Sequence, residues 1–173
     1  MTASRVAMAL VGAGALLAVA LTVRTSVTRP PAPAVERVNL DITLKDMNGA
    51  DVRLSTFAGR PILINLWATW CGPCRLETPQ LVDLHGRFKD RGLVILGISI
   101  DDAPEAIRAF AKEFTVPYPM LVGRDQPAFL AALGYTDPVP VSVFITRDGT
   151  VSTRVTGIDT TAAMERRVLA LFE

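Results

Sequence analysis

Residues 61–79 read PILINLWATWCGPCRLETP, and this stretch carries the strongest indication of the fold class. Its first seven residues are almost wholly apolar, which is typical of a central β-strand buried on both faces. A long helix is predicted from about Cys71 to Asp90, and Gly92 closes it. The sequence therefore places its two cysteines, Cys71 and Cys74, where a buried strand meets the start of a helix.

Strands and helices alternate along the rest of the domain, with hairpin turns at Asn48-Gly49 and at residues 147–150. This order predicts a three-layer α/β sandwich with helices on both faces of a mainly parallel sheet. The closing hairpin adds antiparallel strands at one edge, so the central sheet is mixed, and the first hairpin is an N-terminal β-hairpin extension. The other predicted strands are 40–44, 52–54, 93–100, 118–122, 141–146 and 150–156. Asp101 or Asp102 is predicted to cap a helix that runs to about Phe114. The other predicted helices are 127–133 and one that starts at Asp159 or Thr160 and runs to about Leu171.

The amino terminus carries an unbroken run of apolar and small residues at 6–23. Its length is near the minimum for a membrane span and long for the core of a signal peptide. An A-x-A pattern at 18–20 lies inside the run instead of after it, which favours an uncleaved anchor over a cleaved signal peptide. A proline-rich stretch follows and reads as an extended tether. We therefore expect residues 1–24 to be the anchor or signal peptide, 25–36 the tether and 37–173 the folded domain.

The composition limits the chemistry. The chain of 173 residues has a net charge of +1, which gives no reason to expect a nucleic-acid partner. Two cysteines and one histidine are too few for a zinc site, which needs about four ligands, so no metal site is expected. A purely structural disulfide is the other alternative, but a bridge over so short a loop would constrain the unfolded chain little.

The position of Cys71 at a helix amino terminus suits thiol chemistry, because free N–H groups and the helix dipole stabilise a thiolate there. We expect Cys71 to be exposed and to attack a substrate disulfide first, and Cys74, one turn deeper, to resolve the mixed disulfide. Pro73 falls within the first helical turn, where its missing N–H costs little. Glu77 follows Cys74 by three residues on the same helix face, so it either tunes the cysteines and moves a proton or is an ordinary solvated charge.

The segment from Asn65 to Pro79 resembles the active-site segment of the TlpA/ResA/CcmG family of membrane-tethered or periplasmic thioredoxin-like proteins. The similarity extends over nearly all of residues 40–172, including Lys45-Asp46-x-x-Gly49 and the stretch GISIDD at 97–102. It implies a thioredoxin-like fold and disulfide reduction outside the cytoplasm, on the periplasmic side of the bacterial cytoplasmic membrane. It also implies no cofactor beyond the Cys71–Cys74 disulfide. We expect a monomer.

The resemblance also implies partners. Apocytochrome c is a frequent substrate of the family, while some members serve copper-site assembly in cytochrome oxidase, and electrons come from a membrane thiol carrier of the CcdA/DsbD kind. The family's buried active-site glutamate falls on Glu77, and its cis-proline falls on Pro140, with Pro138 a weaker candidate. A cis bond there would leave the Val139 backbone free to pair with an extended substrate.

Other residues of the segment have simpler interpretations. Trp70 is expected on the docking surface together with Gly72 and Pro73, whereas Trp67 is expected to pack in the core. Asn65 stands where thioredoxin carries a buried aspartate, and an amide cannot relay a proton.

Two further functions remain as alternatives. A peroxidase of the peroxiredoxin kind calls for a threonine three residues before the reactive cysteine, where this chain has Ala68. A copper chaperone would bind the metal through both thiolates, but it would gain support from a third ligand, and none is close in sequence. The Gly72-Pro73 pair between the cysteines matches the reducing thioredoxins and favours a reductase.

Overall fold

The computed structural model describes residues 36–173. The predicted anchor at 6–23 and nearly all of the predicted tether lie outside the described residues. No helix within the described part of the chain is long and apolar enough to span a membrane.

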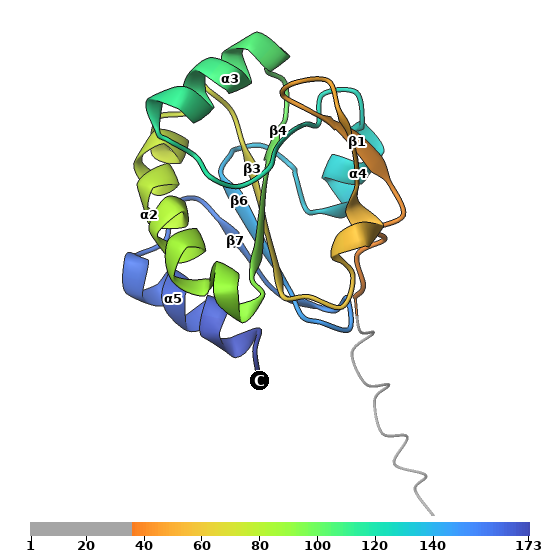
Figure 1. The fold of residues 1–173 in the computed structure, drawn as a ribbon, viewed down its shortest axis with the longest axis vertical. Helices are drawn as coiled ribbons and strands as arrows, with labels where there is room; N and C mark the ends of the chain where they lie inside the picture. Colours follow the sequence, from red (N-terminus) through yellow and green to blue (C-terminus); the bar gives the residue numbers. More distant parts are fainter. Residues whose placement is uncertain (1–35) are drawn as a thin grey trace, which may run out of the picture. The chain divides into compact units, whose positions relative to one another are not determined.

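One sheet runs through the domain, with the strand order β2-β1-β5-β4-β3-β6-β7 (Figure 1). The pairs β3–β4 and β4–β5 are parallel, and the remaining four pairs are antiparallel. The mixed sheet and its antiparallel edge are confirmed, but the prediction of a mainly parallel sheet is wrong, because the N-terminal hairpin joins β5 antiparallel as well. The strands are β1 Thr43–Asp46, β2 Asp51–Arg53, β3 Ile62–Trp67, β4 Val94–Ser99, β5 Met120–Val122, β6 Val141–Ile145 and β7 Val151–Thr156.

Helices cover both faces of this sheet, as predicted. Figure 1 shows β3, β4, β6 and β7 lying between α2 on one side and α4 on the other. Ion pairs join α2 to both α3 and α5: Arg75 pairs with Glu113, and Arg87 pairs with Glu165. The helices are α2 Gly72–Phe88, α3 Pro104–Glu113, α4 Pro127–Ala132 and α5 Thr161–Ala170, with short 3-10 turns η1 Leu54–Phe57 and η2 Lys89–Arg91.

Local sequence signals account for some helix ends and not for others. Thr160 caps α5, because its side-chain oxygen accepts a hydrogen bond from the N–H of Ala163 at 3.2 Å. The prediction that Asp101 or Asp102 caps the next helix is wrong, since α3 begins at Pro104 after an Ala103 cap that makes no side-chain bond. The two aspartates bind Thr69 and Trp70 instead.

The register of the central strands brings three loops to one edge of the sheet. Trp67 at the end of β3 pairs with Ser99 at the end of the parallel strand β4. Strand β6 runs the other way and begins at Val141, opposite Leu66. The loops 68–71, 100–103 and 137–140 therefore meet where β3 gives way to α2. Every residue of β3, β4 and β6 is buried, so this edge rests on a rigid core.

Candidate active site

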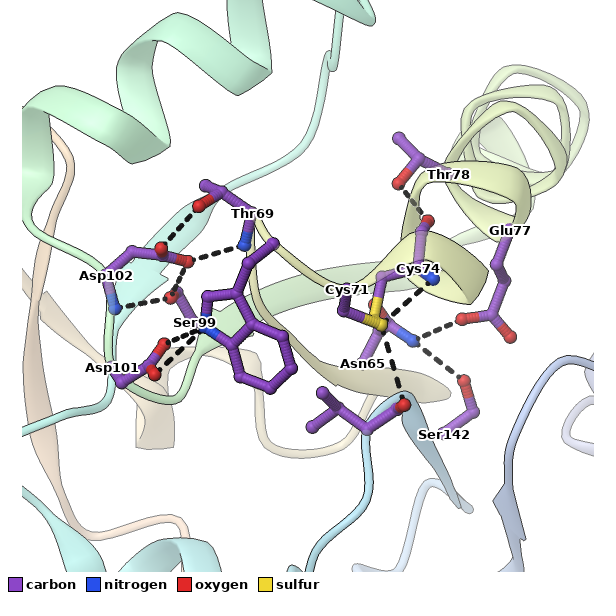
Figure 2. The surroundings of a disulfide bond; sticks show 12 residues. Asn65, Thr69, Cys71, Cys74, Glu77, Thr78, Ser99, Asp101, Asp102 and Ser142 are labelled. Atoms are coloured by element: carbon purple, nitrogen blue, oxygen red, sulfur yellow. Dashed lines mark hydrogen bonds between the residues drawn. A yellow bond between two sulfur atoms is a disulfide. The ribbon is translucent and has the colours of Figure 1, made fainter.

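A disulfide joins Cys71 to Cys74 at the start of α2 (Figure 2). Cys71 is the residue that caps the helix, and its sulfur accepts a hydrogen bond from the N–H of Cys74 at 3.1 Å. This N–H is one of the free donors of the first helical turn. It would stabilise negative charge on the Cys71 sulfur when the disulfide is opened.

The prediction that Cys71 is exposed is wrong for this oxidised form. The residue is 4% exposed and Cys74 is 2% exposed. The loop before β6 covers the bond, and the carbonyl oxygen of Val139 lies 3.5 Å from the Cys71 sulfur. The loop at Val139 therefore lies directly against the Cys71 sulfur.

The residues expected to contact a substrate surround the disulfide. Trp70 is 61% exposed, and Gly72 and Pro73 are also exposed. The peptide bond before Pro140 is cis, as predicted, and the bond before Pro138 is cis as well. Val139 between them is buried, and its carbonyl group faces the sulfur.

Two consecutive aspartates after β4 hold the residues that lead into Cys71. The carboxylate of Asp102 accepts hydrogen bonds from the backbone N–H of Thr69 at 2.8 Å and from its hydroxyl at 2.6 Å. It also accepts from the Ser99 hydroxyl at 2.7 Å. Asp101 accepts from the indole N–H of Trp70 at 3.0 Å. Sequence reasoning singled out the stretch GISIDD through the family resemblance but assigned the aspartates to a helix cap, so it missed both roles.

Glu77 is completely buried behind the disulfide, which excludes its alternative interpretation as a solvated helix charge (Figure 2). Its Oε2 accepts a hydrogen bond from the side-chain amide of Asn65 at 2.8 Å. Burial raises the pKa of the carboxyl to about 7, because the cost of desolvating the charge outweighs the bond from Asn65, and the charge of Asp159 adds to the rise. A carboxyl that titrates near neutral pH can both give and take a proton under ordinary conditions.

Two further residues of the segment, Trp67 and Arg75, contact side chains of helix α3 or its C-terminal cap. Trp67 is buried, and its ring lies 4.2 Å from the ring of Phe110, which confirms the expected core position. Arg75 pairs with Glu113 and lies over the ring of Phe114 at 5.0 Å. The positive charge of Arg75 is therefore paired with a carboxylate of helix α3.

The sequence is similar to a protein family and to relatives of known activity. Residues 35–154 match the AhpC/TSA family. The thiol-disulfide oxidoreductase ResA of Geobacillus kaustophilus is 32% identical over 154 residues, which cover 88% of this chain and 87% of the relative. The ResA protein of Geobacillus thermodenitrificans is 31% identical over 130 residues, 75% of this chain and 74% of the relative.

Solved structures agree on the architecture. Mycobacterium tuberculosis DsbF, determined in mixed oxidised and reduced forms, superposes with a TM-score of 0.69 at 26% identity. The superposition covers 78% of this chain and 98% of that one. A thioredoxin-family thiol:disulfide interchange protein from Chlorobium tepidum has a TM-score of 0.73 at 24% identity, covering 82% of this chain and all of that one. The thioredoxin-like fold predicted from the resemblance is confirmed.

The activity of the chain follows from the disulfide at the start of α2 together with these relatives. Similarity to the ResA proteins spans most of both chains, and the cysteine pair has the surroundings that disulfide exchange requires. The chain belongs to the AhpC/TSA family and is a thiol-disulfide oxidoreductase with a thioredoxin-like fold.

Proposed function

We propose that the protein reduces cysteine pairs of other proteins outside the cytoplasm, with apocytochrome c as the principal substrate. The observation that carries the redox chemistry is the disulfide whose Cys71 sulfur meets a helix N–H at 3.1 Å. In the reduced protein this donor favours the thiolate, which is the attacking species in disulfide exchange.

The reaction proceeds in two exchanges. The Cys71 thiolate attacks one sulfur of the substrate disulfide, so that a mixed disulfide forms and one substrate thiolate leaves. Cys74 loses its proton and attacks the Cys71 sulfur, which releases the second substrate thiolate and re-forms the Cys71–Cys74 bond. The substrate gains two electrons and leaves as two thiolates, which take up protons from water, and the enzyme is left oxidised with the proton of Cys74 held on the proposed acceptor.

Glu77 is the group proposed to move the proton of Cys74. It lies on the next turn of the same helix and is completely buried. Its pKa of about 7 lets the ionised carboxyl accept the thiol proton during resolution and return it when the enzyme is reduced again.

The substrate surface is proposed to be the exposed group of Trp70, Gly72 and Pro73 together with the loop at Val139 and Pro140. An extended substrate segment that pairs with the Val139 backbone would lie beside the Cys71 sulfur. The choice of apocytochrome c, and of a CcdA/DsbD-type electron donor, is supported by the family resemblance. Cysteine pairs that are reduced during copper-site assembly in cytochrome oxidase are the competing substrate class.

The place of action is part of the proposal. Residues 1–24 would anchor the protein in the cytoplasmic membrane, with residues 6–23 as the span, and residues 25–36 would tether the domain of residues 37–173 on the periplasmic side. Alkaline extraction of membranes and protease treatment of spheroplasts test this location.

A trapping experiment tests the substrate. Replacing Cys74 by serine removes the resolving thiol, so a substrate stays disulfide-linked to Cys71. The full-length Cys74→Ser protein is expressed, the adducts are purified and released with a reductant, and the captured proteins are identified by mass spectrometry. The Cys71→Ser/Cys74→Ser double variant is the matched control.

An apocytochrome c enriched over the double variant is the expected result. Recovery of only a copper-binding oxidase subunit would overturn the substrate assignment. Recovery of the same proteins with both variants would overturn the mixed-disulfide mechanism.

A further inference from the structure

Three buried polar side chains form a cluster behind the disulfide (Figure 2). Asn65 of β3 is 4% exposed, and Glu77 of α2 and Ser142 of β6 are completely buried. Their neighbours in β3 and β6 are mostly large apolar residues. Polar groups in such a core cost stability unless they have partners, so the way these three are connected matters.

The connection runs through the amide nitrogen of Asn65. That nitrogen carries two N–H donors, and both have partners: one donates to Oε2 of Glu77 at 2.8 Å and the other to Oγ of Ser142 at 3.1 Å. Asn65 and Ser142 face each other in the register of the antiparallel pair β3–β6. Ser142 therefore fixes the orientation of the amide from the sheet, and the amide points its second donor at the carboxyl.

The two oxygens of the Glu77 carboxyl are not equivalent as a result. Oε2 faces a permanent N–H donor, which cannot accept a proton. Oε1 is buried and has no hydrogen-bond partner among residues 36–173. In a neutral carboxyl the carbonyl oxygen accepts a hydrogen bond better than the hydroxyl oxygen does, so the Asn65 N–H favours the form of the acid that carries its proton on Oε1.

We propose that Asn65 and Ser142 are positioning residues for Glu77: Ser142 orients the Asn65 amide, and the amide holds the carboxyl so that its proton is bound and released at Oε1. This inference rests on the proposed function, in which Glu77 exchanges a proton with Cys74.

Charged and titratable groups around the cluster act on the same carboxyl. Asp159, which precedes α5, raises the pKa of Glu77 through its charge, while its own carboxylate accepts a bond from Arg167 at 3.0 Å. The pKa of the buried Tyr118 is raised mainly by burial and further by Glu77. The Asn65 amide is the one group in the described part of the chain that donates a hydrogen bond to the Glu77 side chain, so it is the main stabiliser of the ionised form.

The test measures the titration of Glu77 itself. In the oxidised protein the side-chain carboxyl carbon is followed by NMR against pH, and the Glu77 signal is identified by its loss in Glu77→Gln. Asn65→Leu removes the donor, and we expect the titration midpoint to rise by about one pH unit or more. Ser142→Ala removes one acceptor of the Asn65 amide and leaves the donor to Glu77 in place but free to turn. We therefore expect a smaller rise in the titration midpoint of Glu77.

Thr78→Val is the matched control. Thr78 is a buried neighbour of Glu77 on the same helix, but its hydroxyl donates to the carbonyl of Cys74 at 2.8 Å and does not join the cluster. We expect the Glu77 midpoint to be unchanged in this variant. If Asn65→Leu does not fold, the nearly isosteric Ser142→Ala decides alone.

The outcomes separate this inference from the proposed function. A midpoint unchanged in Asn65→Leu and Ser142→Ala, or raised equally by Thr78→Val, overturns the positioning role. The pH dependence of the reaction of the reduced protein with a model disulfide is measured in parallel. If the Glu77 midpoint moves but the pH profile of the rate does not, the positioning role is supported and proton transfer by Glu77 is contradicted. If the midpoint and the rate profile move together, the positioning role and the proton transfer are both supported.

Discussion

Asp102 accepts a hydrogen bond from the backbone N–H of Thr69 at 2.8 Å, which ties the loop after β4 to the loop that enters α2. The same carboxylate binds the Thr69 hydroxyl and the Ser99 hydroxyl. Thr69 lies two residues before Cys71, so this contact holds the loop that leads into the reactive cysteine. Three residues of the motif GISIDD, namely Ser99, Asp101 and Asp102, take part in these contacts.

Replacing Asp102 by alanine should destabilise the oxidised protein by about 2–4 kcal/mol. The substitution leaves the N–H of the half-buried Thr69 and the hydroxyl of the buried Ser99 without their acceptor. Urea unfolding followed by circular dichroism measures the loss. Asp101→Ala is the control, because the indole of the exposed Trp70 can bond to water instead. Equal losses in the two variants would contradict the anchoring role of Asp102.

The buried Glu77 should make stability fall as the pH rises. Its pKa is about 7 in the folded protein against 4.5 in the unfolded chain, so between these values the folded form holds the extra proton. Stability is therefore highest at low pH within this window and declines until the folded carboxyl ionises. Relative to Glu77→Gln, the wild type should lose about 2.5 kcal/mol of unfolding free energy between pH 5 and pH 8.

Urea unfolding of both oxidised proteins at several pH values measures this difference, and other titrating groups cancel in it. A difference that is flat from pH 5 to pH 8 would show that Glu77 is not desolvated in the folded state.

Two glycines, Gly97 and Gly123, are predicted to accept a side chain only at a cost in stability. A Cβ at Gly97 would lie 2.6 Å from the sulfur of Met120, and one at Gly123 would lie 2.8 Å from the backbone oxygen of Ser99. Gly97→Ala should cost about 1–3 kcal/mol, and Gly123→Ala should cost more, because a backbone carbonyl yields less than the end of a methionine.

Gly86→Ala is the matched control for these two. Gly86 lies inside α2, and an added Cβ would meet nothing within 4 Å. It should stabilise the protein by about 0.5–1 kcal/mol, because alanine loses less backbone entropy than glycine in a helix. Thermal melts of the three oxidised variants would contradict this account if Gly97→Ala proved as stable as Gly86→Ala.

Features that depend on neighbouring residues could be predicted from the sequence. The apolar run before Trp67 is a fully buried strand, the cysteine pair begins the next helix, and Thr160 caps the last one. Each of these follows from side chains within a few positions of one another. The cis bond before Pro140 was expected from the family resemblance and is present.

Features that depend on distant contacts could not be predicted. Asp102 has the side chain of a helix cap, but its partner Thr69 is 33 residues away and forms the stronger set of bonds. Cys71 has the helix position of an exposed nucleophile, yet the loop at Val139 covers it. The partner of Asp102 and the burial of Cys71 both depend on how the loops at this edge of the sheet pack against one another.

The two cysteines should differ strongly in reactivity once the disulfide is reduced. Cys71 caps α2, and its sulfur can accept a hydrogen bond from the N–H of Cys74, so the helix start should favour its reactive thiolate form. Cys74 lies inside the helix beside the buried Glu77, where a negative charge is disfavoured. Alkylation of the single variants by iodoacetamide at pH 7, followed by mass spectrometry, should be at least about tenfold faster for Cys71 in Cys74→Ser than for Cys74 in Cys71→Ser. Equal rates would mean that the helix start does not activate Cys71, and the order of attack proposed here would then have no physical basis.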